Sequence, residues 1–224
     1  MNPKEFRQTI YDWKLNRFHM KTDMANPMKP SEISSFVEKL KVKASKKTLE
    51  YVFEFGGAFK HPYTPVPDAI IPGSFSPSHR LGEFYMMHWR EILDTHKMLT
   101  KVSEDGDFDD LTPINDPDIK PLWHCAGWLP FATNGAGDFL CIDFEPAKSG
   151  TKGQVICVPG EMPERLVLAS SMNEFFERLC DSYVKNKLYI NEDYELRKET
   201  QSTFPVFKRM VRVAKSKKKG PSGI

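Results

Sequence analysis

Two glycine-rich turns on either side of a short apolar run constrain the fold of this chain more than any other feature. They lie in residues 134–156, which read NGAGDFLCIDFEPAKSGTKGQVI. The apolar run between the turns, residues 139–142, is too short for a helix and is bounded as a strand would be. Similar runs predict strands over residues 122–131, 154–158 and 165–168. We therefore expect a sheet whose neighbouring strands are joined by turns.

The residues before this sheet predict helices instead. In residues 3–20, apolar side chains recur at spacings of four and three, which is typical of an amphipathic helix. A second helix is expected over residues 31–40, with Ser31 as its N-cap. A third is expected from Ser45 onward, and the glycine pair at 56–57 would end it.

Two further helices complete the predicted elements. One begins near Trp89, and the other follows residues 171–174 (SMNE). This second segment predicts a capping box, in which Ser171 caps the amide of Glu174 and the glutamate reaches back. Helices thus precede the strands and one helix follows them, without regular alternation of strand and helix. This order predicts the α+β class, with a mainly antiparallel sheet flanked by helices.

Composition narrows the class of protein. With 40% hydrophobic residues, the 224-residue chain can build a core. Its formal net charge of +2 is too small to indicate a nucleic-acid-binding protein. Its apolar runs fall far short of the ~20 residues that span a bilayer, and its first residues lack the apolar core of a signal peptide. The four cysteines include no CxxC and lie among apolar residues, so we expect buried free thiols and a cytoplasmic location.

The glycine-rich turn at GAGDFL does not predict a nucleotide site. Leu140 stands where a dinucleotide-binding fingerprint has its third glycine. The glycines also precede a strand, so no helix N-terminus would face a phosphate. We therefore expect no cofactor.

Three carboxylates in the same stretch, Asp138, Asp143 and Glu145, raise the possibility of a hydrolase. Asp138 and Asp143 are five residues apart, so along a strand they would face opposite sides and lie roughly 16 Å apart. Catalytic acid pairs of the glycosidase type need about 5–9.5 Å. The histidines show no metal-ligand spacing, and no GxSxG is present. A hydrolase is kept as the third alternative.

The acidic segment from Glu104 to Asp118 is expected to be an exposed loop. Its aspartates resemble the start of a calcium loop, but Asp110 occupies the position that requires glycine for the sharp turn. No metal is therefore expected here. The basic run at residues 208–219 is expected to be a solvated tail, without direct binding of nucleic acid.

The stretch from Trp128 to Leu179 resembles the SUKH superfamily, which includes the fungal cell-wall-synthesis regulators of the Smi/Knr type and many bacterial immunity proteins. The likeness lies in the ordered motifs WLPFATNGAGDFLCIDFEP, GTKGQVI and LVLASSMNEFFERL. The residues that match the family's pattern are Trp128, Pro130, Gly135, Gly137, Asp138, Asp143, Pro146, Gly153 and Gln154. The chain departs from that pattern at Ala44, where the family often has proline, and at the glycine pair 56–57, where it usually has Asn-Gly.

The resemblance implies a family domain over residues 25–186. Residues 1–24 would then be an N-terminal helical extension, and residues 187–224 a C-terminal extension with a basic tail. It also implies a domain that binds other proteins and is not an enzyme. The family-motif residues would maintain the scaffold, with the glycines forming turns and Asp138 bonding to local amides.

For the partner, the resemblance implies first a cognate toxin. The compact turns GAGDFLCID and SGTKGQV resemble those of bacterial members, which neutralise toxins of the nuclease or deaminase type. Acidic side chains could then mimic phosphates in the toxin's active site, and the candidate contact residues are Glu104, Asp105, Asp107, Asp109 and Asp110. The alternative is a regulatory scaffold of the fungal cell-wall-synthesis type.

Overall fold

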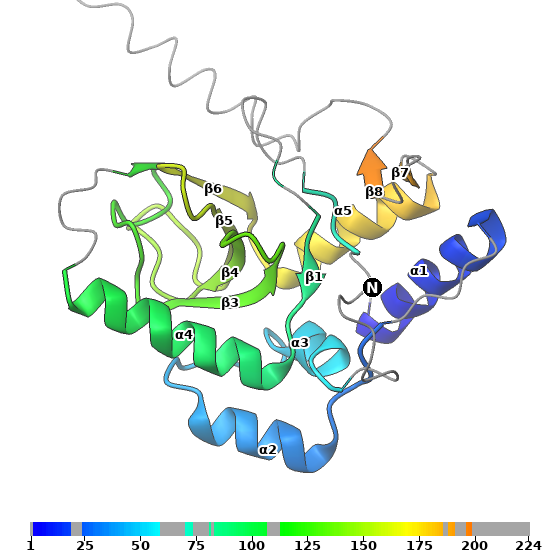
Figure 1. Cartoon of the computed structure of the whole chain (residues 1–224), viewed down its shortest axis with the longest axis horizontal. Helices are drawn as coiled ribbons and strands as arrows, with labels where there is room; N and C mark the ends of the chain where they lie inside the picture. The colour runs from blue at the N-terminus through cyan, green and yellow to red at the C-terminus, as the bar shows by residue number, and fades with distance from the viewer. Residues whose placement is uncertain are drawn as a thin grey trace, which may run out of the picture.

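A computed structural model describes residues 2–18, 24–58, 70–73, 81, 83–106, 113–185, 188–190 and 196–198. Figure 1 shows how their helices and strands follow one another. The elements are α1 (Pro3–Phe18), α2 (Pro30–Lys39), α3 (Glu50–Phe55), β1 (Tyr85–Met86), α4 (Trp89–Glu104), β2 (Ile114–Asn115), β3 (Trp128–Thr133), β4 (Phe139–Asp143), β5 (Gln154–Val158), β6 (Glu164–Ala169), α5 (Met172–Val184), β7 (Leu188–Ile190) and β8 (Leu196–Lys198).

The main sheet has the strand order β1-β3-β4-β5-β6-β2. Every pairing is antiparallel except that of β2, which runs parallel to β6. The turn between β3 and β4 places Trp128 opposite Asp143 and Thr133 opposite Phe139. β7 and β8 form a separate antiparallel pair. The predicted α+β class with a mainly antiparallel sheet is therefore confirmed.

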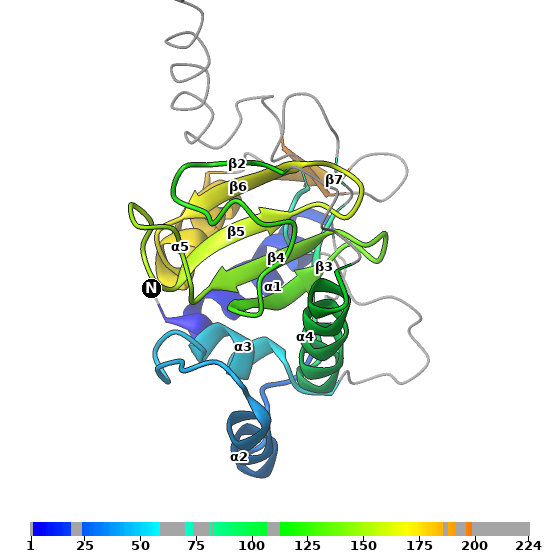
Figure 2. The same ribbon diagram turned by 90° about the vertical axis from the view of Figure 1, so that its left-hand side faces the viewer.

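Two apolar clusters lie on the two faces of the sheet. The larger joins Leu140 and Ile142 of β4 to α1, α3 and α5. The smaller contains Cys141 of the same strand and lies under the segment around residues 119–125. The alternation follows from the two-residue period of a strand, which turns successive side chains to opposite faces. In Figure 2 the sheet is seen with α1 and α5 behind it.

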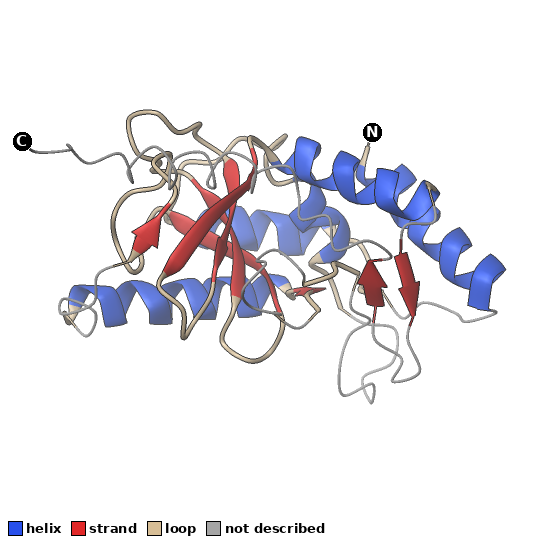
Figure 3. Cartoon of the chain, turned by 90° about the horizontal axis from the view of Figure 1, so that it is seen from above, coloured by secondary structure: helices blue, strands red, loops and turns tan. Residues whose placement is uncertain are grey.

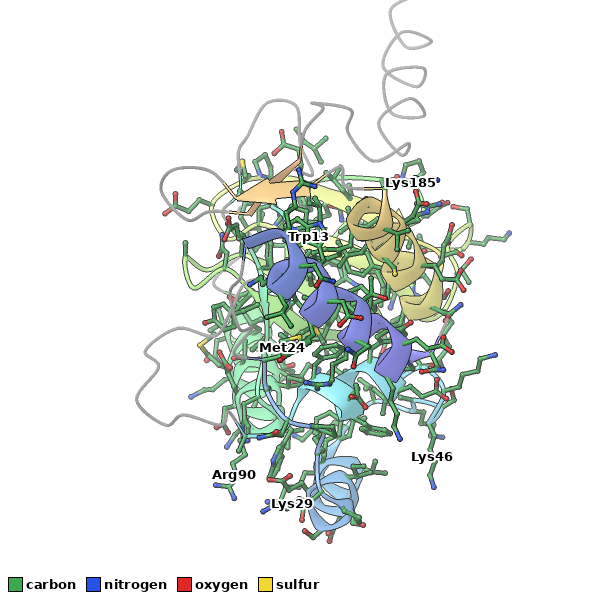
Figure 4. All side chains as sticks on the ribbon, turned by 90° about the vertical axis from the view of Figure 1, so that its right-hand side faces the viewer. Trp13, Met24, Lys29, Lys46, Arg90 and Lys185 are labelled. Atoms are coloured by element: carbon green, nitrogen blue, oxygen red, sulfur yellow. The ribbon has the colours of Figure 1, made fainter. Side chains whose placement is uncertain are left out.

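The N-terminal helix is packed into the larger cluster. Phe6 is fully buried, and its ring contacts those of Tyr51, Phe55, Phe176 and Tyr183 in edge-to-face arrangements. Edge-to-face aromatic pairs add about 0.5–1.5 kcal/mol each beyond the burial of their area. Figure 4 shows α1 and α5 side by side. The region before the predicted family domain thus shares its core with that domain.

Two of the predicted helix starts are wrong. Ser31 lies inside α2, and Lys29 is the N-cap, with its amide donating to Glu32 (2.8 Å). The reason is Pro30, whose fixed φ suits the first helical position. The helix predicted from Ser45 begins at Glu50, because residues 45–49 form turns in which Ser45 Oγ accepts from the amide of Thr48.

The final helix begins as predicted, with one change. Ser171 is the N-cap of α5 and accepts from the amide of Glu174 (3.2 Å). The Glu174 carboxylate reaches back to the amide of Ser170 (2.7 Å) and not to that of Ser171. The amides of Glu174 and Ser170 therefore both have side-chain acceptors, and the bond from Glu174 is displaced by one residue from the usual capping box.

The strand predicted over residues 122–131 begins only at Trp128. The preceding residues cover the second face of the sheet and are held there by Arg165 of β6. Its guanidinium donates to the Trp123 carbonyl from two nitrogens (3.2 and 3.1 Å) and stacks over the Trp123 ring. These contacts hold residues before Trp128 outside the strand pairing, so tertiary contact overrides the local apolar pattern here.

Candidate protein-interaction site

The turn between β3 and β4 uses both oxygens of Asp138 within the chain. One oxygen accepts from the amide of Gly160 (2.9 Å), and the other from the side-chain amide of Asn134 (2.6 Å). Gly135 and Gly137 have φ of 77° and 92°, in the left-handed region that favours glycine. These bonds tie the β3–β4 turn to the segment that follows β5.

At the other end of β4, Asp143 is fully buried. Its carboxylate accepts from the amide of Glu145 (2.9 Å) and from the side chain of Gln154 (2.9 Å). Gln154 also donates to the carbonyl of Asp118 (2.9 Å), so it links three segments. Burial raises the pKa of Asp143, and these bonds oppose the rise. Among the other matched residues, Pro146 follows this corner and Gly153 directly precedes β5.

Glu145 lies in different surroundings from the two aspartates. It is exposed and pairs with Lys120, with 2.7 Å between Oε2 and Nζ. The hydrogen bond from Lys120 lowers the pKa of this carboxyl. Asp138 directly precedes β4 and Asp143 ends it, so these two carboxylates lie at opposite ends of a five-residue strand. Both also accept hydrogen bonds from backbone amides, those of Gly160 and Glu145, which weighs against the hydrolase hypothesis.

The acidic segment is only partly an exposed loop. Glu104 ends α4 and Asp105 is its C-cap, and both are exposed. Further along, the predicted loop is wrong, because Ile114 and Asn115 pair with β6 and Asp116 is buried. The predicted contact residues Asp107, Asp109 and Asp110 lie outside the described residues. Within the described part of the chain, no cluster of His, Cys, Asp or Glu could hold a metal ion.

A groove between α2 and α4 is a candidate binding site. Its volume is about 540 Å³. It is lined by residues from α4 and from the end of α2 with the segment that follows it: Lys39, Lys41, Trp89, Arg90, Leu93, Asp94, His96, Lys97, Thr100, Lys101 and Glu104. The two helices lie next to each other in both Figure 1 and Figure 2. We call this feature the α2–α4 groove.

Positive charge dominates the α2–α4 groove. Five of its lining residues are basic (Lys39, Lys41, Arg90, Lys97 and Lys101), whereas two are acidic (Asp94 and Glu104). In the part of the chain that the structure describes, none of the five cations belongs to a salt bridge. These charges are therefore available to a ligand.

The floor of the groove is apolar and its buried histidine is neutral. Trp89 is almost fully buried, and Leu93 is half-buried against the core. His96 Nε2 donates to the Ala126 carbonyl (2.7 Å), which attaches α4 to the segment before β3. Burial lowers the pKa of His96, so positive charge in the groove at neutral pH comes from lysine and arginine.

The α2–α4 groove was not predicted from the sequence. The helix predicted near Trp89 is present as α4, and its buried residues include Ile92 and His96. The spacing of Arg90, Lys97 and Lys101 places them on one helical face. That pattern alone does not distinguish a solvated face from a groove wall, because the opposing wall comes from residues about fifty positions earlier in the chain.

The sequence matches a family model described as the SMI1 / KNR4 family (SUKH-1) over residues 27–178. A KNR4/SMI1 homolog of Kluyveromyces lactis is 30% identical over 104 residues, which are 46% of this chain and 19% of that protein. A KNR4/SMI1 homolog of Yarrowia lipolytica is 32% identical over 77 residues, or 34% of this chain and 11% of that protein.

A third relative carries a functional name. The cell wall assembly regulator SMI1 of Saccharomyces cerevisiae is 24% identical over 79 residues, which are 34% of this chain and 16% of that protein. The matched stretches thus span less than a fifth of the length of these relatives. None of the helices in the described residues has the length and apolarity needed to cross a bilayer.

Proposed function

Because this chain belongs to the SMI1/KNR4 family (SUKH-1), we propose that it is a non-enzymatic, protein-binding regulator of the fungal cell-wall type. The observation that carries the proposal is the family match over residues 27–178, together with a relative named as a cell wall assembly regulator. A regulator of this kind acts by holding partners on its surface. The partners and the process are proposed for this chain by analogy with that relative.

The site geometry supports a binding role over a catalytic one. The carboxylates of the family motif are bonded to their own scaffold: Asp138 to Gly160, and Asp143 to Glu145 and Gln154. Five cations that form no salt bridge within the described residues line the α2–α4 groove, together with apolar Trp89 and Leu93. A rigid scaffold with an open charged surface suits recognition of another protein.

The immunity-protein interpretation now ranks second. The relatives named above come from fungi and are described as KNR4/SMI1 proteins, which favours the regulator alternative over neutralisation of a bacterial toxin. All four cysteines are free and buried, which supports the proposal that the protein works in a reducing compartment such as the cytoplasm.

Deletion of the gene in its own organism tests this proposal. We expect the deleted strain to become sensitive to a wall-digesting glucanase, and the wild-type chain expressed from a plasmid to restore growth. An isogenic strain carrying the empty plasmid is the matched control. Unchanged resistance to the glucanase in the deleted strain would overturn the regulator proposal.

A further inference from the structure

We propose that the α2–α4 groove binds an acidic segment of a partner protein, with an apolar side chain of that segment placed on the floor formed by Trp89 and Leu93. This proposal rests on the protein-binding function proposed above and names the chemistry of the partner.

The first argument is charge. Lys97 and Lys101 are exposed one helical turn apart on α4, and Lys39 and Lys41 face the same groove from the end of α2. Two helices therefore present cations toward one volume. Because none of these cations is held in a salt bridge within the described residues, an incoming carboxylate does not have to displace an internal partner.

The second argument is the geometry of Arg90. Its guanidinium lies 5.0 Å from the centre of the Trp89 ring, in a cation–π contact. A stacked guanidinium is held by the ring while its N–H groups remain free to donate to a carboxylate in a bidentate arrangement. Arg90 is exposed in this position. Figure 4 shows it projecting from the molecule.

The third argument is the apolar lining and the size of the groove. Trp89 and Leu93 contribute apolar side chains to its lining. A volume of about 540 Å³ falls in the range of about 300–1,000 Å³ that is usual for ligand sites. The groove can therefore hold side chains as well as charges.

These features favour a peptide over nucleic acid. A phosphate backbone carries a charge at every nucleotide, and Asp94 and Glu104 in the groove wall would repel some of those charges. An acidic peptide can place uncharged residues beside these two carboxylates. The apolar floor likewise fits a leucine or phenylalanine side chain, whereas the phosphate backbone offers no counterpart.

The test is a selection of random dodecapeptides displayed on phage against the full chain. The groove variant is Lys97→Glu/Lys101→Glu. Its matched control is Lys46→Glu/Lys47→Glu, which makes the same change in net charge at two exposed lysines outside the groove. Figure 4 shows Lys46 on the opposite side of the view from Arg90.

We expect the selected peptides to be rich in Asp and Glu around one apolar residue. A fluorescein-labelled consensus peptide should then bind the groove variant at least about tenfold more weakly, since two attractions become repulsions. It should bind the control variant within about twofold of wild type. The proposal is overturned if no peptide is selected, or if the consensus peptide binds the groove variant as tightly as it binds the wild type.

Two further probes distinguish other anionic ligands. The probes are a single-stranded DNA dodecamer and phosphatidylserine vesicles. If either binds more tightly than the consensus peptide, and the same groove substitutions weaken that binding, the peptide proposal is overturned in favour of that ligand. The experiments also distinguish failure of the groove proposal from failure of the regulator proposal. If the groove variant restores glucanase resistance in the deleted strain and the peptide does not bind, the regulator proposal stands and the groove proposal falls.

Discussion

Basic side chains have different roles in the sheet and in the α2–α4 groove: one is buried and bonded within the chain, and the others are exposed. Arg165 of β6 is fully buried, and its guanidinium donates to three backbone carbonyls, those of Trp123, Met162 and Glu164. Lys97 and Lys101 of α4 are exposed and take part in no salt bridge within the described residues. Arg165 therefore stabilises the fold, whereas Lys97 and Lys101 are available to a ligand.

The family-motif residues and the proposed binding surface differ in the same way: the polar side chains of the first are bonded within the chain, and the cations of the second are not. Figure 3 shows the strands between the helices, and the motif residues lie on those strands and at their ends. Because their polar atoms are bonded within the chain, a change there is expected to affect stability. A change in the groove is expected to affect binding with little change in stability.

The largest effect is expected for Arg165→Ala. The substitution removes all the side-chain donors to the Trp123 and Met162 carbonyls and leaves a cavity, so we expect a loss of about 3 kcal/mol or more in the free energy of unfolding. Burial lowers the pKa of Arg165 to about 10, so the group is charged at neutral pH. The measurement is urea denaturation followed by circular dichroism.

The control for that prediction is Lys185→Ala. Lys185 forms an exposed pair with Asp181 (2.6 Å) on α5, and such pairs contribute about 0–1 kcal/mol. Equal losses for the two variants would contradict the difference between buried and exposed cations.

A slightly smaller effect is expected for Asp143→Ala. It removes the side-chain acceptor of the Glu145 amide and one of the two acceptors of the buried Gln154 side chain, at a cost of about 2–3 kcal/mol. Glu145→Ala, two residues away, removes an exposed ion pair with Lys120 and a long contact from the Cys125 thiol, and should cost about 1 kcal/mol or less. Thermal unfolding of both variants measures the difference, and a larger loss for Glu145→Ala would show that the assignment is wrong.

The pH dependence of stability is expected to depend on His124. Burial lowers its pKa to about 3, with smaller contributions from His96 and Arg165. The unfolded state binds a proton near pH 6.5, whereas the folded state does not, so stability is present above pH 6.5 and is lost as the pH falls toward 3.

From neutral pH to pH 5 this loss should be about 2 kcal/mol for one group. Denaturation curves of wild type and His124→Gln at pH 7 and pH 5 measure it. The difference between the two proteins isolates His124 from other titrating groups, among them Asp143 and His96. An identical pH dependence for the two proteins would exclude His124 as its source.

The smallest effect on stability is expected for Lys97→Glu/Lys101→Glu. Exposed substitutions away from special features usually change stability by about 0.5 kcal/mol or less. The free energy of unfolding should therefore match that of the Lys46→Glu/Lys47→Glu control, although peptide binding differs. A loss above about 1 kcal/mol confined to the groove variant would show that these lysines also stabilise the fold.

Prediction from the sequence was most accurate where neighbours in the chain determine the structure. The strand bounds at β5, the cap at Ser171 and the glycine turn between β3 and β4 all follow from residues within about four positions. It was less accurate where a distant residue intervenes. β2, for example, forms because β6 supplies its parallel partner. The start of α2 is an exception, because there the error at Ser31 comes from its neighbour Pro30.

The sequence by itself determined the family, the α+β class and the residues that form the turns, because these depend on patterns of nearby residues. Only the tertiary structure decided that Arg165 is buried under Trp123, and that the end of α2 faces Lys97 and Lys101 across a groove. Both features join residues more than forty positions apart, and no local pattern specifies which segments pack together or which charges remain without a partner.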